Sequence, residues 1–198
     1  MKGNIRMNKR VKSQVREWAE SIVIAVILAL IIRTFVVQAF KIPSGSMIPT
    51  FEIGDRIFVS KFIYGARIPF TDIRLPALRQ PERGDIVVFL SPEPPRKDYV
   101  KRLIATEGEK VSIKDGCIYI NGVMIDNPSS VRSFYYYNRG EYGKEGEEII
   151  VPKDSYFVLG DNSANSRDSR YWGFVPKRDM IGKAVCIYWP INRIKGIK

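Results

Sequence analysis

The chain has 198 residues, of which 45% are hydrophobic and 27% are charged, a balance typical of one globular domain with an appendage. It contains no histidine, which excludes Ser-His-Asp triads, histidine-bound zinc and imidazole as a general base. Its formal net charge of +11 raises nucleic acid or an anionic membrane surface as partners, and the position of that charge decides between them.

The N-terminal 40 residues combine a basic arm with an apolar run. Residues 1–17 carry six lysines and arginines, and residues 21–32 are largely apolar. We predict a membrane anchor at 18–34, and its extension to Phe40 supplies the ~20 positions that a spanning helix needs if Glu20 lies in one interface and Arg33 reaches the other or marks the end. Because basic flanks stay in the cytoplasm, we expect a cytoplasmic N-terminus and an extracytoplasmic domain at 35–198, in a single-pass protein of the cytoplasmic membrane.

A cleavable secretory signal is the alternative interpretation of this segment. A basic region, an apolar core and a small residue at Ala39 match that template, whereas Arg33, shortly before the site, argues against it. A mature protein that begins at Phe40 would show cleavage, and self-cleavage after Ala39 stays open. The other basic residues are scattered among acidic ones without a nucleic-acid-binding motif, so the expected partner is the lipid bilayer and not nucleic acid.

The body of the chain reads as short β-strands separated by Gly, Pro, Asp and Asn. The Asp115-Gly116 and Asn121-Gly122 pairs favour two-residue hairpin turns, so the strands should be antiparallel. No segment with a helical period follows the anchor, and the predicted class is all-β with one N-terminal transmembrane helix. The predicted strands, rich in β-branched and aromatic residues, are 55–61, 85–90, 99–105, 110–113, 117–120, 148–151, 156–159 and 183–188.

Two features of the body have open interpretations. Residues 129–146 form a tyrosine-rich excursion, expected to be exposed, whose aromatic side chains either cover the edge of a core or contact a partner or lipid. Cys117 and Cys186 are far apart and have neither a CxxC nor a metal-site spacing. The simplest interpretation is two small strand residues, and a disulfide between them stays open.

Ser46 lies in the stretch IPSGSMIPT at 42–50, where Pro43 and Pro49 stiffen the chain. Such a stretch is often only a turn. A serine that acts as a nucleophile needs a base, and the chain has neither a G-x-S-x-G elbow nor a serine followed by lysine at the third position. Without histidine, the remaining base is a lysine from elsewhere in the fold.

Strand periodicity selects Lys101 as that lysine. Alternation in 99–105 places Tyr99, Lys101 and Leu103 on one face and Val100, Arg102 and Ile104 on the other. If one face packs on the core, only one of the two cations is well solvated. Burial disfavours the ammonium form, so a buried lysine can be a general base near pH 7, whereas arginine cannot. The simpler alternative is that the aliphatic part of Lys101 packs on the protein while its amine extends into solvent and has no catalytic role.

Residues 160–174 form a third cluster, dense in Asp, Asn, Ser and Arg. Its simplest interpretation is a loop that satisfies its own backbone. Asp168 and Arg170 can also form a charge-assisted pair that fixes a nearby serine hydroxyl. A metal site at Asp161, Asn162 and Asp168 lacks the EF-hand spacing, so no metal ion or other cofactor is expected.

Together the three clusters resemble the bacterial type I signal peptidases, membrane-bound serine endopeptidases that remove signal peptides from exported preproteins. The similarity covers nearly the whole chain and rests on the order of the motifs at 44–50, 54–61, 83–89, 99–108 and 160–174. It implies antiparallel sheets coiled into a barrel-like domain, preproteins as substrates, and a single anchor as in the short members of the family.

The resemblance also implies roles for individual residues. Ser46 is the nucleophile and Lys101 the general base, and the Ser44 hydroxyl with the Ser46 backbone N–H forms the oxyanion hole. Ser166 orients the lysine ammonium, with Asp168 and Arg170 behind it. The pockets for small substrate residues are lined by Ile42, Met47 and Tyr99.

Two other functions remain to be weighed. A membrane-tethered, non-catalytic β module would bind a partner through its tyrosine-rich segment and would need neither Ser46 nor Lys101. A Ser-Lys autoprotease of the repressor kind would cut its own chain and carry a DNA-binding region, which the first 40 residues do not resemble.

Overall fold

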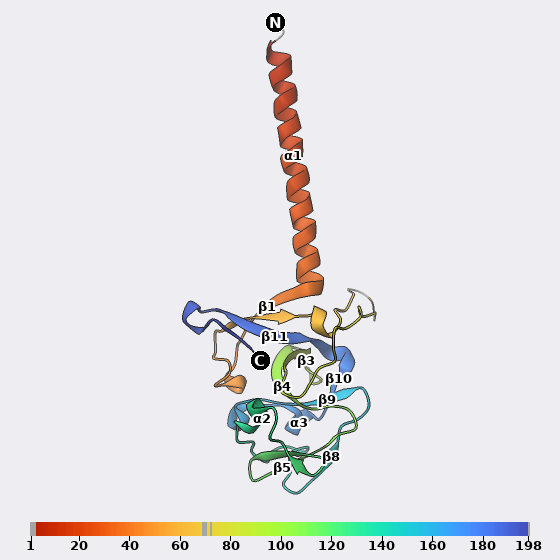
Figure 1. Ribbon diagram of the computed structural model, residues 1–198, viewed down its shortest axis with the longest axis vertical. Coiled ribbons are helices and arrows are strands. Elements are labelled where there is room, and N and C mark those ends of the chain that lie inside the picture. Colours follow the sequence, from red (N-terminus) through yellow and green to blue (C-terminus); the bar gives the residue numbers. More distant parts are fainter. Residues whose placement is uncertain (1–2, 69–70, 72, 198) are drawn as a thin grey trace.

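The structure, a computed structural model, describes residues 3–68, 71 and 73–197. Helix α1 (Gly3–Ile31) continues into one π-helical turn, η1 (Ile32–Val36), and projects from the rest of the molecule (Figure 1). The part from Gln14 to Val36 has the length and composition to cross a membrane, and none of its most apolar stretch is buried. The helix thus extends two residues beyond the predicted end of the anchor and includes most of the basic arm.

The larger sheet has eight antiparallel strands in the order β1-β2-β11-β3-β4-β9-β10, with β12 added to β11. Register shifts in β11 are bulges that bend the strand, and the sheet curls into a half-barrel (Figure 1). The strands are β1 (Val37–Lys41), β2 (Arg56–Ser60), β3 (Ile86–Leu90), β4 (Asp98–Ala105), β9 (Ser155–Leu159), β10 (Val175–Pro176), β11 (Met180–Trp189) and β12 (Lys195–Gly196).

The smaller sheet lies at the end of the molecule farthest from α1 (Figure 1). Its antiparallel order is β7-β6-β5-β8, formed by β5 (Lys110–Lys114), β6 (Cys117–Ile120), β7 (Val123–Met124) and β8 (Ile149–Ile150). Both predicted hairpin turns are present, since Asp115 and Asn121 adopt φ of 49° and 52° before glycines that also have positive φ. The antiparallel, all-β prediction is therefore confirmed.

All eight predicted strand regions contain a strand, whereas the sequence does not predict β1, β7, β10 or β12. Three of these four have only two residues each, too short for a recognisable alternation. The other helical elements are short: α2 (Ser129–Arg132), α3 (Ser169–Trp172), and the 3₁₀ turns η2 (Gly45–Met47), η3 (Phe62–Tyr64), η4 (Ser163–Asn165), η5 (Lys177–Asp179) and η6 (Ile191–Arg193).

The segment 129–146 is part of a core and not a free excursion. Val131 and Tyr136 are buried in the cluster that joins the two sheets, and Phe134 packs against it. Tyr135 and Tyr137 are 60% and 44% exposed. The segment therefore covers a core edge and presents alternate tyrosines to solvent. The two cysteines are free thiols and lie in different sheets, Cys117 on β6 and Cys186 on β11.

Candidate active site

Ser46 lies in the 3₁₀ turn η2, between the two prolines that stiffen this part of the chain. A distant residue, Asn162, holds the turn in place. The Asn162 backbone N–H donates to the Ser46 carbonyl at 3.0 Å, and its side-chain amide donates to the Gly45 carbonyl at 2.9 Å. Ser44 directly precedes the turn in an extended conformation and lines the groove described below. Two hydrogen bonds from Asn162 thus hold the backbone of the turn that carries the Ser46 hydroxyl.

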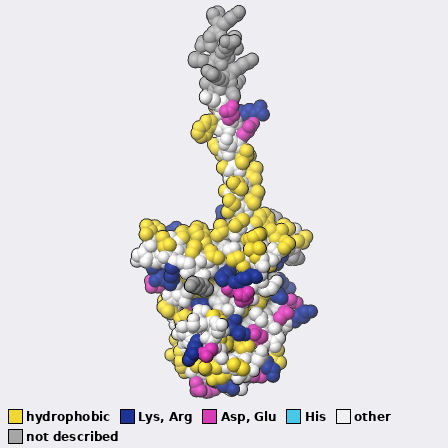
Figure 2. Space-filling model, viewed as in Figure 1, with side chains coloured by type: hydrophobic (Ala, Val, Ile, Leu, Met, Phe, Trp, Pro, Cys, Tyr) yellow, Lys and Arg dark blue, Asp and Glu magenta, His cyan; other side chains and the backbone are white. Residues whose placement is uncertain are grey.

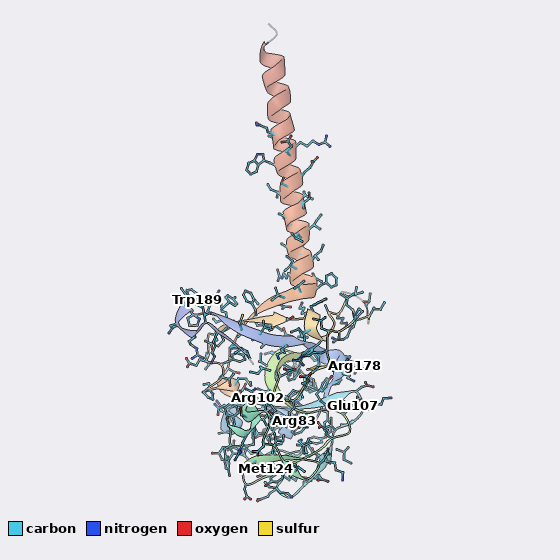
Figure 3. The ribbon with its side chains drawn as sticks, in the orientation of Figure 1. Arg83, Arg102, Glu107, Met124, Arg178 and Trp189 are labelled. Atoms are coloured by element: carbon cyan, nitrogen blue, oxygen red, sulfur yellow. The ribbon has the colours of Figure 1, made fainter. Side chains whose placement is uncertain are left out.

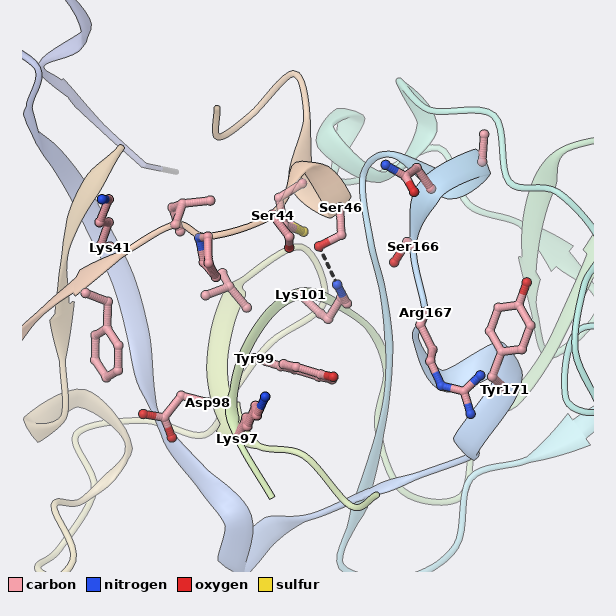
Figure 4. A pocket seen from close by; sticks show the side chains of 17 residues that line it. Lys41, Ser44, Ser46, Lys97, Asp98, Tyr99, Lys101, Ser166, Arg167 and Tyr171 are labelled. Atoms are coloured by element: carbon pink, nitrogen blue, oxygen red, sulfur yellow. Dashed lines mark hydrogen bonds between the residues drawn. The ribbon is translucent and has the colours of Figure 1, made fainter. Parts of the chain in front are cut away.

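Lys101 reaches Ser46 from strand β4. Its Nζ lies 2.6 Å from the Ser46 Oγ, as the dashed line in Figure 4 shows. The side chain is 4% exposed, and burial lowers the pKa of Lys101 to about 8, although the nearby carboxylates of Asp168 and Asp161 favour the charged form. A fraction of this amine is neutral near pH 7 and is then able to accept a proton from the hydroxyl.

The sequence predicts that at most one cation of the β4 strand is well solvated, and in the structure both are buried. Arg102 is 3% exposed and forms a bidentate pair with Asp161 at 2.8 and 2.6 Å. The Thr50 hydroxyl donates to the same carboxylate at 2.5 Å. Alternation correctly separates the two side chains, but tertiary structure covers both faces of β4, and Asp161 supplies Arg102 with a buried ion-pair partner.

A second buried ion pair joins Asp168 and Arg170 behind the lysine. The two side chains are 0% exposed and are linked by two hydrogen bonds of 2.8 Å. Asp168 also accepts from the Gly160 backbone N–H at 3.0 Å, and Arg170 donates to the Ser163 hydroxyl at 2.6 Å. This pair, predicted from the sequence cluster, links the loop after β9 to α3.

Ser166 is brought to the groove beside Lys101, but its hydroxyl makes no hydrogen bond with any described residue although it is buried. A buried hydroxyl without a partner is unfavourable, and rotation about one bond re-aims it. Gly160 allows this approach, since a side-chain carbon there would collide with the Ser166 hydroxyl and the Ser46 carbonyl.

The Ser–Lys pair lies in a groove of about 750 Å³ between residues 40–47, 97–101 and 164–171 (Figure 4). Ile42 and Met47 line its wall and are otherwise buried, and Tyr99 packs its ring 5.5 Å from that of Trp172. The β4–β9 ladder begins at Arg102, so residues 98–101 pair with β3 on one side only and turn their other edge toward the groove. The groove therefore offers both shallow apolar walls and a strand edge.

Sequence reasoning missed the positioning roles of Gly160, Asp161, Asn162 and Arg102. Asp161 and Asn162 had entered only as metal ligands, but Asp161 is bound to Arg102 and Thr50. Within the described ranges, no group of three or more Cys, Asp or Glu side chains is placed to hold a metal ion. The only sequence feature that indicates such positioning roles is the high density of hydrogen-bonding residues in 160–170. That density does not predict which residue each of them contacts.

The half-barrel and the Ser–Lys pair are those of a serine peptidase that works without histidine. The chain belongs to the signal peptidase family: the family described as signal peptidase, peptidase S26, matches residues 15–189. The predicted resemblance is thereby confirmed.

Two sequence relatives agree with this assignment. A probable signal peptidase I-2 of Synechocystis sp. is 41% identical over 183 residues, which cover 90% of this chain and 75% of the relative. The signal peptidase I P of Bacillus subtilis subsp. natto is 35% identical and covers 96% of this chain and 97% of its own length. A solved signal peptidase I of Enterococcus faecalis V583 is 34% identical, with a TM-score of 0.41 over 53% of this chain and 97% of that one.

Proposed function

We propose that this protein is a membrane-bound serine endopeptidase that removes signal peptides from preproteins, with Ser46 as nucleophile and Lys101 as general base. The observation that carries the proposal is the 2.6 Å contact between the Lys101 amine and the Ser46 hydroxyl, made by a buried lysine of lowered pKa. The names of the relatives supply the substrate class, since they are signal peptidases.

The reaction is an acyl transfer in two steps. The neutral Lys101 amine takes the Ser46 proton while the Oγ attacks the scissile carbonyl, and the resulting ammonium then gives that proton to the leaving amine. Water, deprotonated by the same amine, attacks the acyl-enzyme ester, and the ammonium returns that proton to the Ser46 oxygen as the signal peptide is released. The contact geometry supports these steps, because one amine within hydrogen-bond distance of the oxygen serves both directions of proton transfer.

The Ser44 hydroxyl and the Ser46 backbone N–H are the proposed oxyanion donors. Ser44 is exposed at the groove and adopts an extended conformation next to the nucleophile turn, which supports this role. Ser44→Ala should lower kcat by about 10²- to 10³-fold with little change in KM, because the donor acts on charge that develops in the transition state. Steady-state kinetics measure this, and Ser44→Thr, which keeps a hydroxyl, should recover much of the rate. Equal kcat in Ser44→Ala and wild type would exclude the role.

Ser166, Asp168 and Arg170 are proposed to position the lysine. The buried Ser166 hydroxyl has no partner in the described chain and lines the same groove, so it is placed to accept from the ammonium after proton transfer. Asp168 and Arg170 hold the loop that carries Ser166, since Arg170 donates to the Ser166 carbonyl at 3.3 Å. These residues act through Lys101 and not on the substrate.

The substrate is proposed to bind as an extended strand along the groove. Residues 98–101 offer the strand edge, and Ile42, Met47 and Tyr99 form shallow walls that suit small side chains next to the scissile bond. Backbone pairing fixes the register, so the small pockets select the residue that is presented to Ser46.

The protein is proposed to be a single-pass membrane protein with a cytoplasmic N-terminus and the catalytic domain outside. The basic arm supports this orientation. Hydrophobic side chains gather on the end of the domain nearest α1 (Figure 2), and Trp189 on that rim is labelled in Figure 3. Phe62, Ile191 and Ile194 are also exposed, on elements next to β2 and β11, so this end is proposed to contact lipid. Labelling of Cys117 in intact cells by an impermeant maleimide checks the orientation, and labelling only after lysis would contradict it.

The decisive test of the activity is cleavage in trans. Detergent-solubilised protein incubated with a signal-bearing preprotein should release a product whose new N-terminus, read by sequencing, follows a small residue. Ser46→Ala should release none. A non-catalytic module would give no product with either protein, and an autoprotease would cut only its own chain; either result would overturn the proposal.

A further inference from the structure

A second pocket, of about 320 Å³, lies where the anchor helix meets the catalytic domain. Among the described residues it shares only Asp98 with the groove of the Ser–Lys pair. Thr34 and Gln38 form one wall, and Thr34 belongs to the stretch Gln14–Val36 that is long enough to span a bilayer. With the anchor in a membrane, the pocket lies at the level of the lipid headgroups.

The pocket carries an excess of positive charge. Four cationic side chains line it against two carboxylates, and one of these, Asp179, is held by Arg96 outside the pocket at 2.5 Å. In the part of the chain that the structure describes, Lys61, Arg74 and Arg178 have no carboxylate within ion-pair distance. Arg178 is labelled in Figure 3, in the half of the domain nearer the anchor.

Arg74 is held rigidly although no described carboxylate forms an ion pair with it. Within the described ranges its guanidinium donates to backbone carbonyls alone, those of Gly65, Arg178 and Met180, at 3.1, 2.9 and 2.6 Å. Burial lowers the pKa of Arg74, and so does the neighbouring charge of Arg67. Fixed, partly desolvated positive charge of this kind is relieved by an incoming anion.

Lys61 completes the cationic side of the pocket beneath the anchor. Its amine lies 3.5 Å from the carbonyl oxygens of Arg33 and Thr34, where the helix ends. Burial lowers the pKa of Lys61 and the charge of Arg33 adds to this effect, whereas the carboxylate of Asp98, which also lines the pocket, opposes it. Leu90, Met180 and Ile181 add apolar side chains to the lining of the pocket. The site thus combines cations, which suit a phosphate group, with apolar side chains, which suit the glycerol ester next to that phosphate in a phospholipid.

We propose that this pocket binds the phosphate group of an anionic glycerophospholipid, with Lys61, Arg74 and Arg178 as its ligands. The inference rests on the membrane anchoring proposed above. The same chemistry suits a free phosphate monoester, so the experiment separates the two sources. A bound headgroup would fix the height of the domain against the membrane, and with it the height of the groove.

The test uses the full chain in phosphatidylcholine nanodiscs that contain spin-labelled phosphatidylglycerol or spin-labelled phosphatidylcholine. The immobilised fraction of each label gives the lipid preference. The wild type should prefer phosphatidylglycerol, and Lys61→Gln/Arg178→Gln should reduce the preference by about fivefold for each cation, the factor that about 1 kcal/mol per surface cation represents. If the double variant unfolds, Arg178→Gln alone is measured in its place. This single variant should stay folded, since the Arg178 side chain makes no hydrogen bond or ion pair with described residues.

Arg56→Gln/Lys195→Gln is the matched control, because it removes the same charge from exposed positions on the same sheet, outside the pocket. Arg56 pairs with Trp189 and Lys195 follows Ile194, at the end proposed to contact lipid, so this variant removes only the attraction of surface charge and should lose clearly less of the preference than the pocket variant. Equal losses in both variants, or no preference in the wild type, would overturn the site. Displacement of the label by millimolar glycerol 3-phosphate would assign the pocket to a free phosphate. Preprotein cleavage in the same discs is read separately, so failure of the proposed peptidase function leaves the lipid measurement valid.

Discussion

Replacing Lys101 by arginine should slow preprotein cleavage by at least about 10²- to 10⁴-fold, the usual contribution of a general base, while the fold survives. Arginine keeps its proton in proteins and cannot take one from Ser46. Cleavage kinetics with thermal unfolding of the same samples measure this. Lys110→Arg, on the exposed surface of β5, is the matched control and should cleave like the wild type. Full activity of Lys101→Arg would refute the general-base role.

The pH dependence of the rate gives an independent measure of the same lysine. The rate should rise through about pH 8, the pKa to which burial lowers Lys101, and fall about tenfold per pH unit below it, because only the neutral amine acts as base. A profile that stays flat from about pH 5 to 10 at unchanged stability would contradict this assignment.

Stability should follow pH in a related way. The folded pKa of Lys101, about 8, lies below the ~10.4 of an unfolded lysine. Between these values the unfolded chain binds more protons, so this group makes the free energy of unfolding rise with pH in that window. Lys101→Met removes the titrating group and should remove its contribution to the rise. Denaturant unfolding at several pH values measures this, and identical pH dependence in both proteins would contradict it.

Asp168→Asn should lower the free energy of unfolding by about 3–5 kcal/mol, since it leaves Arg170 buried without a counter-charge. Glu93→Gln is the matched control, because Glu93 and Arg167 form a similar two-bonded pair on the surface, with side chains 33% and 60% exposed. Its loss should be at most about 1 kcal/mol. Urea unfolding of both variants in one detergent compares them, and equal losses would contradict the role given to burial.

Asp168 should also act on the lysine, in a manner that lost stability alone would not produce. Its negative charge favours the ammonium form of Lys101, whereas Arg170 disfavours it. At a temperature where Asp168→Asn stays folded, the rising limb of its rate should therefore shift to lower pH than in the wild type. A limb that does not move would assign Asp168 to stability only.

The sequence determined this protein's local structure. An apolar run, alternating strands and the Asp-Gly and Asn-Gly pairs are rules over a few neighbouring positions, and they predict the anchor, the strands and both hairpins. Strand alternation also selected Lys101 as a candidate base, and resemblance to a family then implied the roles of Ser46 and Lys101. The short strands β10 and β12 lay outside these rules because two residues carry no periodicity.

Tertiary structure alone decided which side chains meet. Ser46 and Lys101 are 55 positions apart, Arg102 and Asp161 are 59 apart, and Gly45 and Asn162 are 117 apart. Alternation separates the two cations of β4 but cannot tell that both of its faces are covered. The burial that lowers the lysine pKa arises from packing of distant segments, and so does the pocket beneath the anchor. Such desolvation depends on the whole fold, which no local pattern encodes.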